Sequence, residues 1–344
     1  MPGQTPGPLL PRNQGPHSWA PSTRTRRLPI FSGTKHRRNN MRFKTGVQLM
    51  TALWADAFEK GEPVETPPLL IGKPGIGKTT VGKEVSAAMT DIVRQKNSLA
   101  PEALFLALDL SSMLPEDLGG IPKVAKEGDL MVTSFAVQKK LAPFCQPGAY
   151  GVLVLDDITQ AAPAVQVAAR QTVLFRTIGD YKLADGVMLL ITGNRREDKS
   201  NASTLPAHFR NSTCILSVEP DLEEWCEWYG RQPNTEPIIA AYLRWRPANL
   251  AKVPADADKA GAFATPRSWF KLGRMMGVAE ATSTSLEVMK GLVGEGVATE
   301  LRGFMNTRAQ LVDPGKVLEN PEKAMPDPGI SIAPTRLRHD HRTG

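Results

Sequence analysis

Residues 72–79 read Gly-Lys-Pro-Gly-Ile-Gly-Lys-Thr and match the pattern Gly-x-x-x-x-Gly-Lys-Ser/Thr at every fixed position. The apolar run 68–71 before them predicts a buried strand, and 81–93 after them predicts a helix. In this context the glycines let successive backbone N–H groups turn toward one point, and the positive end of the helix dipole adds to the attraction for an anion. The chain is therefore expected to fold around a loop that holds the phosphates of a nucleoside triphosphate.

Two side chains of this loop carry specific roles. The ammonium group of Lys78 supplies a positive charge for the β- and γ-phosphates, and the hydroxyl of Thr79 is a ligand for Mg²⁺. The residues predicted to bind the nucleotide are Gly72, Lys73, Pro74, Gly75, Ile76, Gly77, Lys78, Thr79 and Thr80.

The positive charge of the chain is concentrated at its start. Residues 1–44 contain nine Lys and Arg and no Asp or Glu, and subtracting these nine from the net charge of +7 leaves −2 for the other residues. The remainder thus shows no general affinity for nucleic acid. Residues 1–44 are also rich in Pro and Gly, which predicts a disordered tail. The tail is a solvated extension, a nucleic-acid-binding arm or a transit peptide, and Met41 is an alternative start of the folded chain.

The sequence favours a cytoplasmic protein. No apolar run approaches the ~20 residues that span a bilayer, and the first residues contain no apolar segment typical of a secretory signal. The three cysteines (Cys145, Cys214 and Cys226) form no Cys-x-x-Cys pair, which argues against a disulfide framework or a zinc site.

Strand and helix patterns alternate up to about residue 218, which predicts an α/β fold with a parallel sheet. Strands are expected at 68–71, 103–108, 151–155, 187–191 and 214–218, with a short edge strand at 181–184. Helices are expected at 47–60, 81–93, 135–141 and 160–175, and a loop at 111–128. After residue 219 only helices are expected, at 221–229, 237–245, 268–276 and 285–297. The predicted domains are a tail (1–44), an α/β nucleotide-binding core (45–218), a helical lid (219–312) and a Pro-rich extended tail (313–344).

Acidic and polar residues follow the predicted strands. Asp156 and Asp157 end the strand 151–155, which is the arrangement of a Walker B motif. Asp156 is predicted to hold Mg²⁺ opposite Thr79, and Asp157 to polarise the attacking water. Asn194, in the run Thr-Gly-Asn after the next strand, is predicted to contact the γ-phosphate or orient the water. Arg267, in the run Thr-Pro-Arg at the start of a later helix, is either a contact to the γ-phosphate or a surface residue.

This order of motifs resembles the AAA+ ATPases, and within them the MoxR/dynein-related type. The resemblance covers roughly residues 47–297 and includes Leu-Pro-Glu-Asp-Leu-Gly-Gly-Ile-Pro at 114–122 and the helix 161–176, where Phe175 replaces a Glu. It implies a P-loop NTPase core with a small helical lid. It also implies that Lys78 and Thr79 are Walker A residues, Asn194 is sensor 1 and Arg267 is sensor 2.

The sequence departs from that family at two positions that bear on turnover. The family usually has Glu where this chain has Asp157, and the missing methylene moves the carboxylate back by ~1.5 Å. Because small misplacements slow reactions heavily, hydrolysis is expected to be slow. The family also places a trans-acting arginine just before the last strand. Here Ser212 stands at that point, so either Arg210 serves as the finger or the finger is lost, with Arg176 and Arg195 as other interface candidates.

The resemblance implies Mg²⁺-dependent ATP hydrolysis, a homo-oligomeric ring of hexameric type, and remodelling or chaperone-like action on a protein partner such as a von Willebrand A-domain protein. No Asn-Lys-x-Asp guanine motif is present, which disfavours GTP. Two alternatives stay open: a nucleotide-gated binding switch with little hydrolysis, motivated by Asp157 and Ser212, and a DNA-directed motor or loader, motivated by residues 1–44.

Overall fold

The computed structural model describes residues 41–195, 205–254, 261–281 and 285–309. Its centre is a five-stranded sheet in the order β2–β5–β8–β1–β9, in which every neighbouring pair is parallel. The strands are β1 Pro68–Ile71, β2 Leu104–Asp109, β5 Tyr150–Asp156, β8 Gly186–Gly193 and β9 Cys214–Ser217. The predicted α/β fold with a parallel sheet is therefore confirmed.

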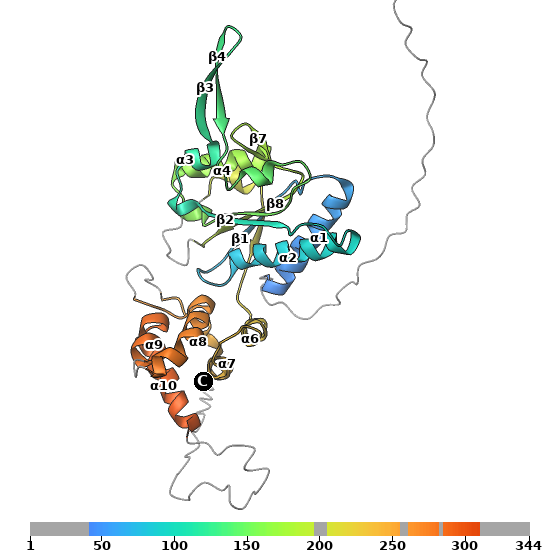
Figure 1. Cartoon of the computed structure of the whole chain (residues 1–344). Coiled ribbons are helices and arrows are strands. Elements are labelled where there is room, and N and C mark those ends of the chain that lie inside the picture. The colour runs from blue at the N-terminus through green and yellow to red at the C-terminus, as the bar shows by residue number, and fades with distance from the viewer. Residues whose placement is uncertain (1–40, 196–204, 255–260, 282–284, 310–344) are drawn as a thin grey trace, which may run out of the picture. The chain divides into compact units, whose positions relative to one another are not determined.

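Helices cover both faces of this sheet (Figure 1). Alternate residues of the central strands point to opposite faces, because the side-chain period of a strand is two. Val152 and Val154 pack in the apolar cluster on the side of the first two helices, while Leu153 and Leu155 pack in the cluster that includes residues of α4. The covering helices are α1 Phe43–Lys60 and α2 Lys78–Lys96 on one side, and α3 Pro115–Gly119 and α4 Pro163–Phe175 on the other. Burial on both faces explains why these strands read as continuous apolar runs.

An antiparallel hairpin, β3 Ile121–Glu127 and β4 Leu130–Ala136, interrupts the alternation of strands and helices. Nearly every residue of the hairpin is exposed, and it extends from the α3 end of the core in Figure 1. The predicted loop at 111–128 and helix at 135–141 were wrong here. Because neither face of the hairpin is buried, its sequence lacks the regular apolar alternation that identifies strands. The predicted edge strand at 181–184 is β7 (Tyr181–Lys182), which pairs only with β6 (Thr177–Ile178).

The C-terminal part of the described chain is helical, as predicted. Its helices are α6 Leu222–Gly230, α7 Pro237–Trp245, α8 Pro266–Ala281, α9 Ser285–Val293 and α10 Glu295–Ala309, preceded by the short α5 Ala207–Arg210. They share an apolar core of their own, in which Tyr242, Trp269 and Leu272 are fully buried. The single helix predicted for 285–297 is two helices, because the chain turns at Gly294 with a φ of 86° that glycine adopts without strain.

The predicted tails lie largely outside the described residues, as do residues 196–204. The predicted domain boundaries remain predictions. Within the described ranges, no helix is both long and apolar enough to cross a membrane.

Candidate functional site

The chemically active residues gather at the carboxyl edge of the sheet, where β1, β5 and β8 end side by side. The register pairs Leu155 with Ile191 and Ile71 with Gly193, so the residues that follow these strands are neighbours. Ligands of open parallel sheets bind outside this edge. The edge is therefore where a phosphate-binding loop and the acids after β5 can act on one ligand.

The loop between β1 and α2 has the backbone that the motif requires. Gly75 and Gly77 adopt φ values of 73° and 97°, in the left-handed region that favours glycine. Gly72 allows close backbone approach, since a Cβ there would lie 2.6 Å from the carbonyl oxygen of Val218. Helix α2 begins at Lys78, so its first N–H groups face the loop.

Lys78 lies inside the loop and is only 6% exposed. Its Nζ donates to the backbone carbonyls of Gly72 (2.9 Å) and Lys73 (2.8 Å), and to Oδ1 of Asn194 (2.9 Å). Asn194 is also buried, and its Nδ2 donates to Oδ1 of Asp157 (3.2 Å). Asn194 thus links the ammonium group of Lys78 to the carboxylate of Asp157.

Thr79 and Asp156 form the candidate metal centre. The hydroxyl of Thr79 lies 2.9 Å from both carboxylate oxygens of Asp156. Mg²⁺ prefers oxygen ligands, and in nucleotide sites it takes one or two protein oxygens and completes its shell with phosphates and water. Among the described residues, no group of three or more His, Cys, Asp or Glu is placed to hold a metal by itself. The donor set therefore fits Mg²⁺ held jointly with a phosphate ligand.

Asp157 sits in an unusual backbone conformation, with φ 54° and ψ 40°. Aspartate tolerates this left-handed region better than most residues. Burial raises the pKa of Asp157, the neighbouring Asp156 raises it further, and Lys78 partly offsets the shift. A raised pKa makes the carboxylate a better proton acceptor, which suits a residue that activates water.

Arg267 reaches this cluster from the helical part of the chain. Its backbone N–H donates to the carbonyl of Gly75 (3.1 Å), so the first turn of α8 contacts the loop directly. A small cavity of about 40 Å³ brings most of the predicted site residues together. It is lined by Pro74, Gly75, Gly77, Lys78, Thr79, Asp156, Asp157, Asn194 and Arg267.

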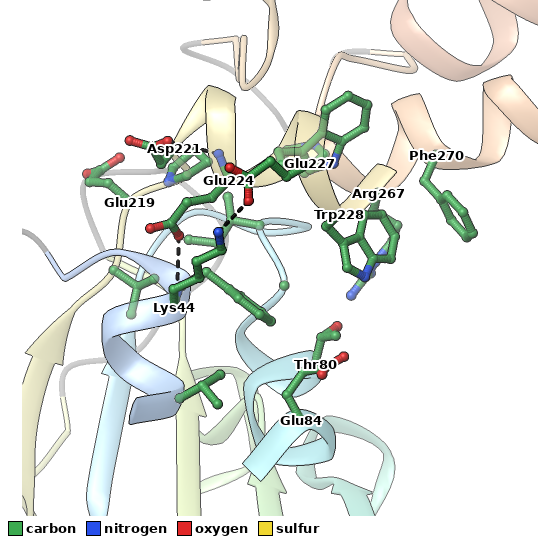
Figure 2. A pocket seen from close by; sticks show the side chains of 18 of the residues that line it. Lys44, Thr80, Glu84, Glu219, Asp221, Glu224, Glu227, Trp228, Arg267 and Phe270 are labelled. Atoms are coloured by element: carbon green, nitrogen blue, oxygen red, sulfur yellow. Dashed lines mark hydrogen bonds and ion pairs between the residues drawn. The ribbon is translucent and has the colours of Figure 1, made fainter. Parts of the chain in front are cut away.

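A larger pocket of about 470 Å³ opens beside this cavity and shares Gly75, Gly77, Thr79 and Arg267 with it. Figure 2 shows Trp228, Arg267 and Phe270 of the helical part across the pocket from Thr80 and Glu84 of α2. The rings of Trp228 and Phe270 are tilted, with centroids 5.0 Å apart. An apolar wall with a polar rim and this volume are typical of a small-molecule site.

The start of α1 closes one side of the pocket. The backbone N–H of Lys44 donates to Glu224 (3.0 Å), and its ammonium group pairs with Glu227, as the dashed lines in Figure 2 mark. Phe43, the residue before, lines the same pocket and lies against Gly77. These contacts tie α1 to α6 at the mouth of the pocket.

The predicted arginine fingers lie elsewhere. Arg210 ends the short helix α5, is exposed, and lines neither pocket. Arg176 is 8% exposed and donates to the carbonyls of Ala184 and Val187, and burial lowers its pKa. Arg195 forms an ion pair with Glu219 (2.5 Å). Arg176 and Arg195 are thus engaged within the chain, whereas the Arg210 side chain faces solvent.

Sequence reasoning missed two groups of residues. Thr192 begins the Thr-Gly-Asn run, which by itself predicts a role only for Asn194, yet the Thr192 hydroxyl contacts Asp156 and the backbone of Asp157. Phe43 and Trp228 of the large pocket had no local motif, because they approach the loop only through the packing of α1 and α6. The register of β5 and β8 would have found Thr192, once the two strands were known to be neighbours.

Comparison with known proteins supports one family. Residues 68–213 match the family model described as "ATPase family associated with various cellular activities (AAA)". No curated protein matches the chain.

Among solved structures, the chain is similar to a mutant of RuvB from Thermotoga maritima, with 13% identity, a TM-score of 0.40 and coverage of 83% of this chain and 79% of that one. It is also similar to NtrX from Brucella abortus, with 12% identity, a TM-score of 0.33 and coverage of 75% and 67%. A third similar structure is Hsp104 in a closed state with ATPγS and FITC-casein, with 16% identity, a TM-score of 0.36 and coverage of 54% and 35%. At these values nothing about function follows from the likeness.

Proposed function

We propose that the chain, whose residues 68–213 match the family model of the AAA ATPases, binds ATP with Mg²⁺ and hydrolyses it to drive a conformational change in a protein partner. In this proposal the triphosphate lies in the small cavity and the base and sugar lie in the larger pocket. The two spaces are adjacent and share Gly75, Gly77 and Thr79 in their linings, which suits a ligand with a phosphate end and a base end.

One observation carries the proposal: the line of contacts from Lys78 through Asn194 to Asp157, beside Thr79 and Asp156. The phosphates would take the place of the backbone carbonyls that Lys78 now contacts, and the ammonium group would neutralise the charge that develops on the γ-phosphate. Asn194 is 5% exposed and would orient the attacking water or the γ-phosphate.

Thr79 and Asp156 are the residues that would hold the metal, which supplies charge neutralisation for the β- and γ-phosphates when bound. Asp157 would accept the proton of the attacking water as the bond to the γ-phosphate forms in line with the leaving group. Arg267 would add positive charge from the helical side. Its contact with the loop makes the position of the helices sensitive to the nucleotide.

The length of the Asp157 side chain supports slow turnover. The carboxylate is one methylene shorter than that of glutamate, and its Oδ1 accepts a hydrogen bond from Nδ2 of Asn194 at the wall of the small cavity. Slow turnover, limited by the length of the Asp157 side chain, is compatible with a molecule that stays in its ATP-bound state for a long time and acts as a nucleotide-gated switch.

The assembly and partner belong to the proposal as well. AAA proteins commonly oligomerise, and the exposed Arg210 is available to act on a neighbouring subunit in a homo-oligomeric ring. We propose remodelling of a protein partner in the manner of the MoxR-like group, because the Pro-x-Asp-Leu-x-Gly segment and the Thr-Pro-Arg run are both present. A von Willebrand A-domain protein is a possible partner class in that proposal, and residues 1–44 provide a candidate nucleic-acid contact.

Phosphate release by the purified full chain tests the function. We expect release that requires Mg²⁺ and that Lys78→Ala abolishes, because the ammonium group of Lys78 is buried inside the loop, between the carbonyls of Gly72 and Lys73 and the Oδ1 of Asn194. Lys123→Ala, on the exposed hairpin, is the matched control and should leave the rate unchanged.

Other outcomes distinguish the alternatives. ATP binding without measurable release would overturn hydrolysis in favour of a nucleotide-gated switch. Stimulation of release by DNA that is lost when residues 1–40 are deleted would favour a DNA-directed motor, whereas no stimulation at low salt would exclude it. Mass measurement with and without ATP reports whether a ring forms.

A further inference from the structure

A buried threonine at the end of β8 stands where an apolar residue would continue the core. Met188 and Leu190 point to the α1–α2 side of the sheet and pack in its apolar cluster. The next residue on that side is Thr192, which is 0% exposed. Burying a hydroxyl is costly unless it is hydrogen-bonded, so its partners identify its role.

Both partners of the Thr192 hydroxyl belong to the two acids at the end of β5, Asp156 and Asp157. It donates to Oδ1 of Asp156 and accepts from the backbone N–H of Asp157 (3.1 Å). A hydroxyl has one proton to give and lone pairs to accept with, and Thr192 uses both functions here. The register of the sheet explains the contact, because Leu155 lies opposite Ile191 and the next residues are therefore adjacent.

The contact acts on two properties of the site at once. The donated hydrogen bond orients the Asp156 carboxylate, whose two oxygens also lie 2.9 Å from the Thr79 hydroxyl. The accepted hydrogen bond holds the amide of Asp157, whose left-handed φ of 54° sets the direction of its side chain. A short side chain depends more on its backbone for its position than a long one does.

We propose that Thr192 is a positioning residue that couples the two acids, so that the ligand carboxylate of Asp156 and the water-activating carboxylate of Asp157 keep a fixed relation. This inference rests on the proposed ATPase function and assigns no chemical step to Thr192. Residues that orient a metal ligand through hydrogen bonds contribute strongly to metal affinity. Small displacements of a reacting group reduce turnover sharply.

The test compares Thr192→Val, which keeps the shape and removes the hydroxyl, with Thr192→Ser, which keeps the hydroxyl. Thr90→Val is the matched control. Thr90 is also buried, and its hydroxyl also accepts a backbone N–H (Ala103, 2.9 Å) and donates (Ser86 carbonyl, 3.1 Å), but it lies in α2 and lines neither pocket. Thermal melting and circular dichroism establish that each variant is folded, and Thr192→Ala replaces the valine variant if that one is not.

Two readouts are needed: the Kd for ATP with and without Mg²⁺, and the kcat of phosphate release. For Thr192→Val we expect the Mg²⁺-dependent gain in ATP affinity to shrink by roughly 10-fold. The expected fall in kcat is ~10–100-fold, while the Kd without Mg²⁺ changes by less than about 3-fold. Thr192→Ser should recover most of the Mg²⁺-dependent gain in affinity and most of the kcat. Thr90→Val should leave the gain and the kcat at their wild-type values.

Wild-type behaviour of Thr192→Val in both readouts would overturn the inference, as would equal losses in the serine and valine variants. If the unaltered chain binds ATP but releases no phosphate, the proposed hydrolysis fails. The inference is then decided by the Mg²⁺-dependent gain in affinity alone, and an unchanged gain in Thr192→Val overturns it.

Discussion

The Nζ of Lys78 and the Oδ1 of Asn194 lie 2.9 Å apart, and both side chains are buried. Lysine can only donate, so the carboxamide oxygen faces Lys78 and the amide nitrogen faces Asp157. The residue that follows β8 thus connects the loop after β1 with the acid after β5. The binding of phosphates to Lys78 would release one end of this connection and change the surroundings of Asp157.

The first prediction concerns the charge of Asp157. Its pKa is raised in the folded chain, mainly by burial, so the ionised form destabilises the nucleotide-free protein at neutral pH. The stability associated with protonated Asp157 is complete below the unfolded pKa of about 3.9 and is lost as the pH rises through the folded pKa. We therefore expect Asp157→Asn to raise the Tm at pH 7.5 by about 2–4 °C, the shift that about 1 kcal/mol produces in a chain of this size.

The advantage of Asp157→Asn should disappear as the pH falls below about 4, where the wild-type carboxyl is protonated in both states. Differential scanning calorimetry of both proteins without nucleotide, at a series of pH values from below 4 up to 8, measures this. An equal difference in Tm at every pH would contradict the electrostatic cause. Asp129→Asn, on the exposed turn of the β3–β4 hairpin, is a control for the substitution itself.

The second prediction concerns the length of the same side chain. Asp157→Glu extends the carboxylate by one methylene toward the cavity that Lys78 and Arg267 line. We expect kcat to rise by up to ~10-fold with the Kd for ATP unchanged, since positioning and not binding is altered. Glutamate fits a φ of 54° less well than aspartate, so the Tm should fall slightly. A lower kcat for the glutamate variant would show that Asp157 already has the productive length.

The third prediction concerns the aromatic wall of the large pocket. If the base stacks on Trp228, removing the ring should weaken ATP binding by ~5–100-fold, the range that stacking on an aromatic side chain provides. Inorganic triphosphate carries no base and should bind equally well to Trp228→Ala and to the wild type. Competition of both ligands against a fluorescent ATP analogue makes the comparison. Equal weakening for both ligands would place the base elsewhere.

A fourth prediction uses two glycines with similar backbones and different surroundings. The backbone conformations of Gly75 (φ 73°) and Gly128 (φ 62°) both favour glycine. A Cβ added at Gly75 would lie 2.9 Å from Oγ1 of Thr265, whereas a Cβ added at Gly128 would meet no atom within 4 Å. Both alanine variants should lose about 1 kcal/mol of stability from backbone strain. Only Gly75→Ala should also lose ATP affinity, because it separates α8 from the loop. Isothermal titration of both variants with ATP checks this, and equal affinities would contradict it.

The sequence predicts those site residues that belong to short contiguous motifs. Lys78, Thr79, Asp156 and Asn194 each follow a buried apolar strand, and parallel strands bring their ends to one edge. The short Thr-Pro-Arg run predicts a role for Arg267 only if α8 contacts Gly75. No local sequence pattern shows that contact.

What could not be predicted depends on packing between distant segments. Thr192 gains its partners only through the register of β5 and β8, and Trp228 lines the pocket only because α6 lies beside α1. The hairpin β3–β4 was mistaken for a loop and a helix, since an element exposed on both faces has no apolar periodicity to identify it.

The backbone bond from Arg267 to Gly75 has a thermodynamic consequence. The bond joins α8 to the phosphate loop. A ligand of the loop and a molecule that binds the C-terminal helices therefore act on the same conformational equilibrium. By reciprocity, a partner that changes the affinity for nucleotide by some factor must have its own affinity changed by nucleotide by the same factor. The contact therefore makes the position of the helices depend on whether nucleotide is bound. Equally, a partner bound to the helices could change how long the nucleotide stays in its site.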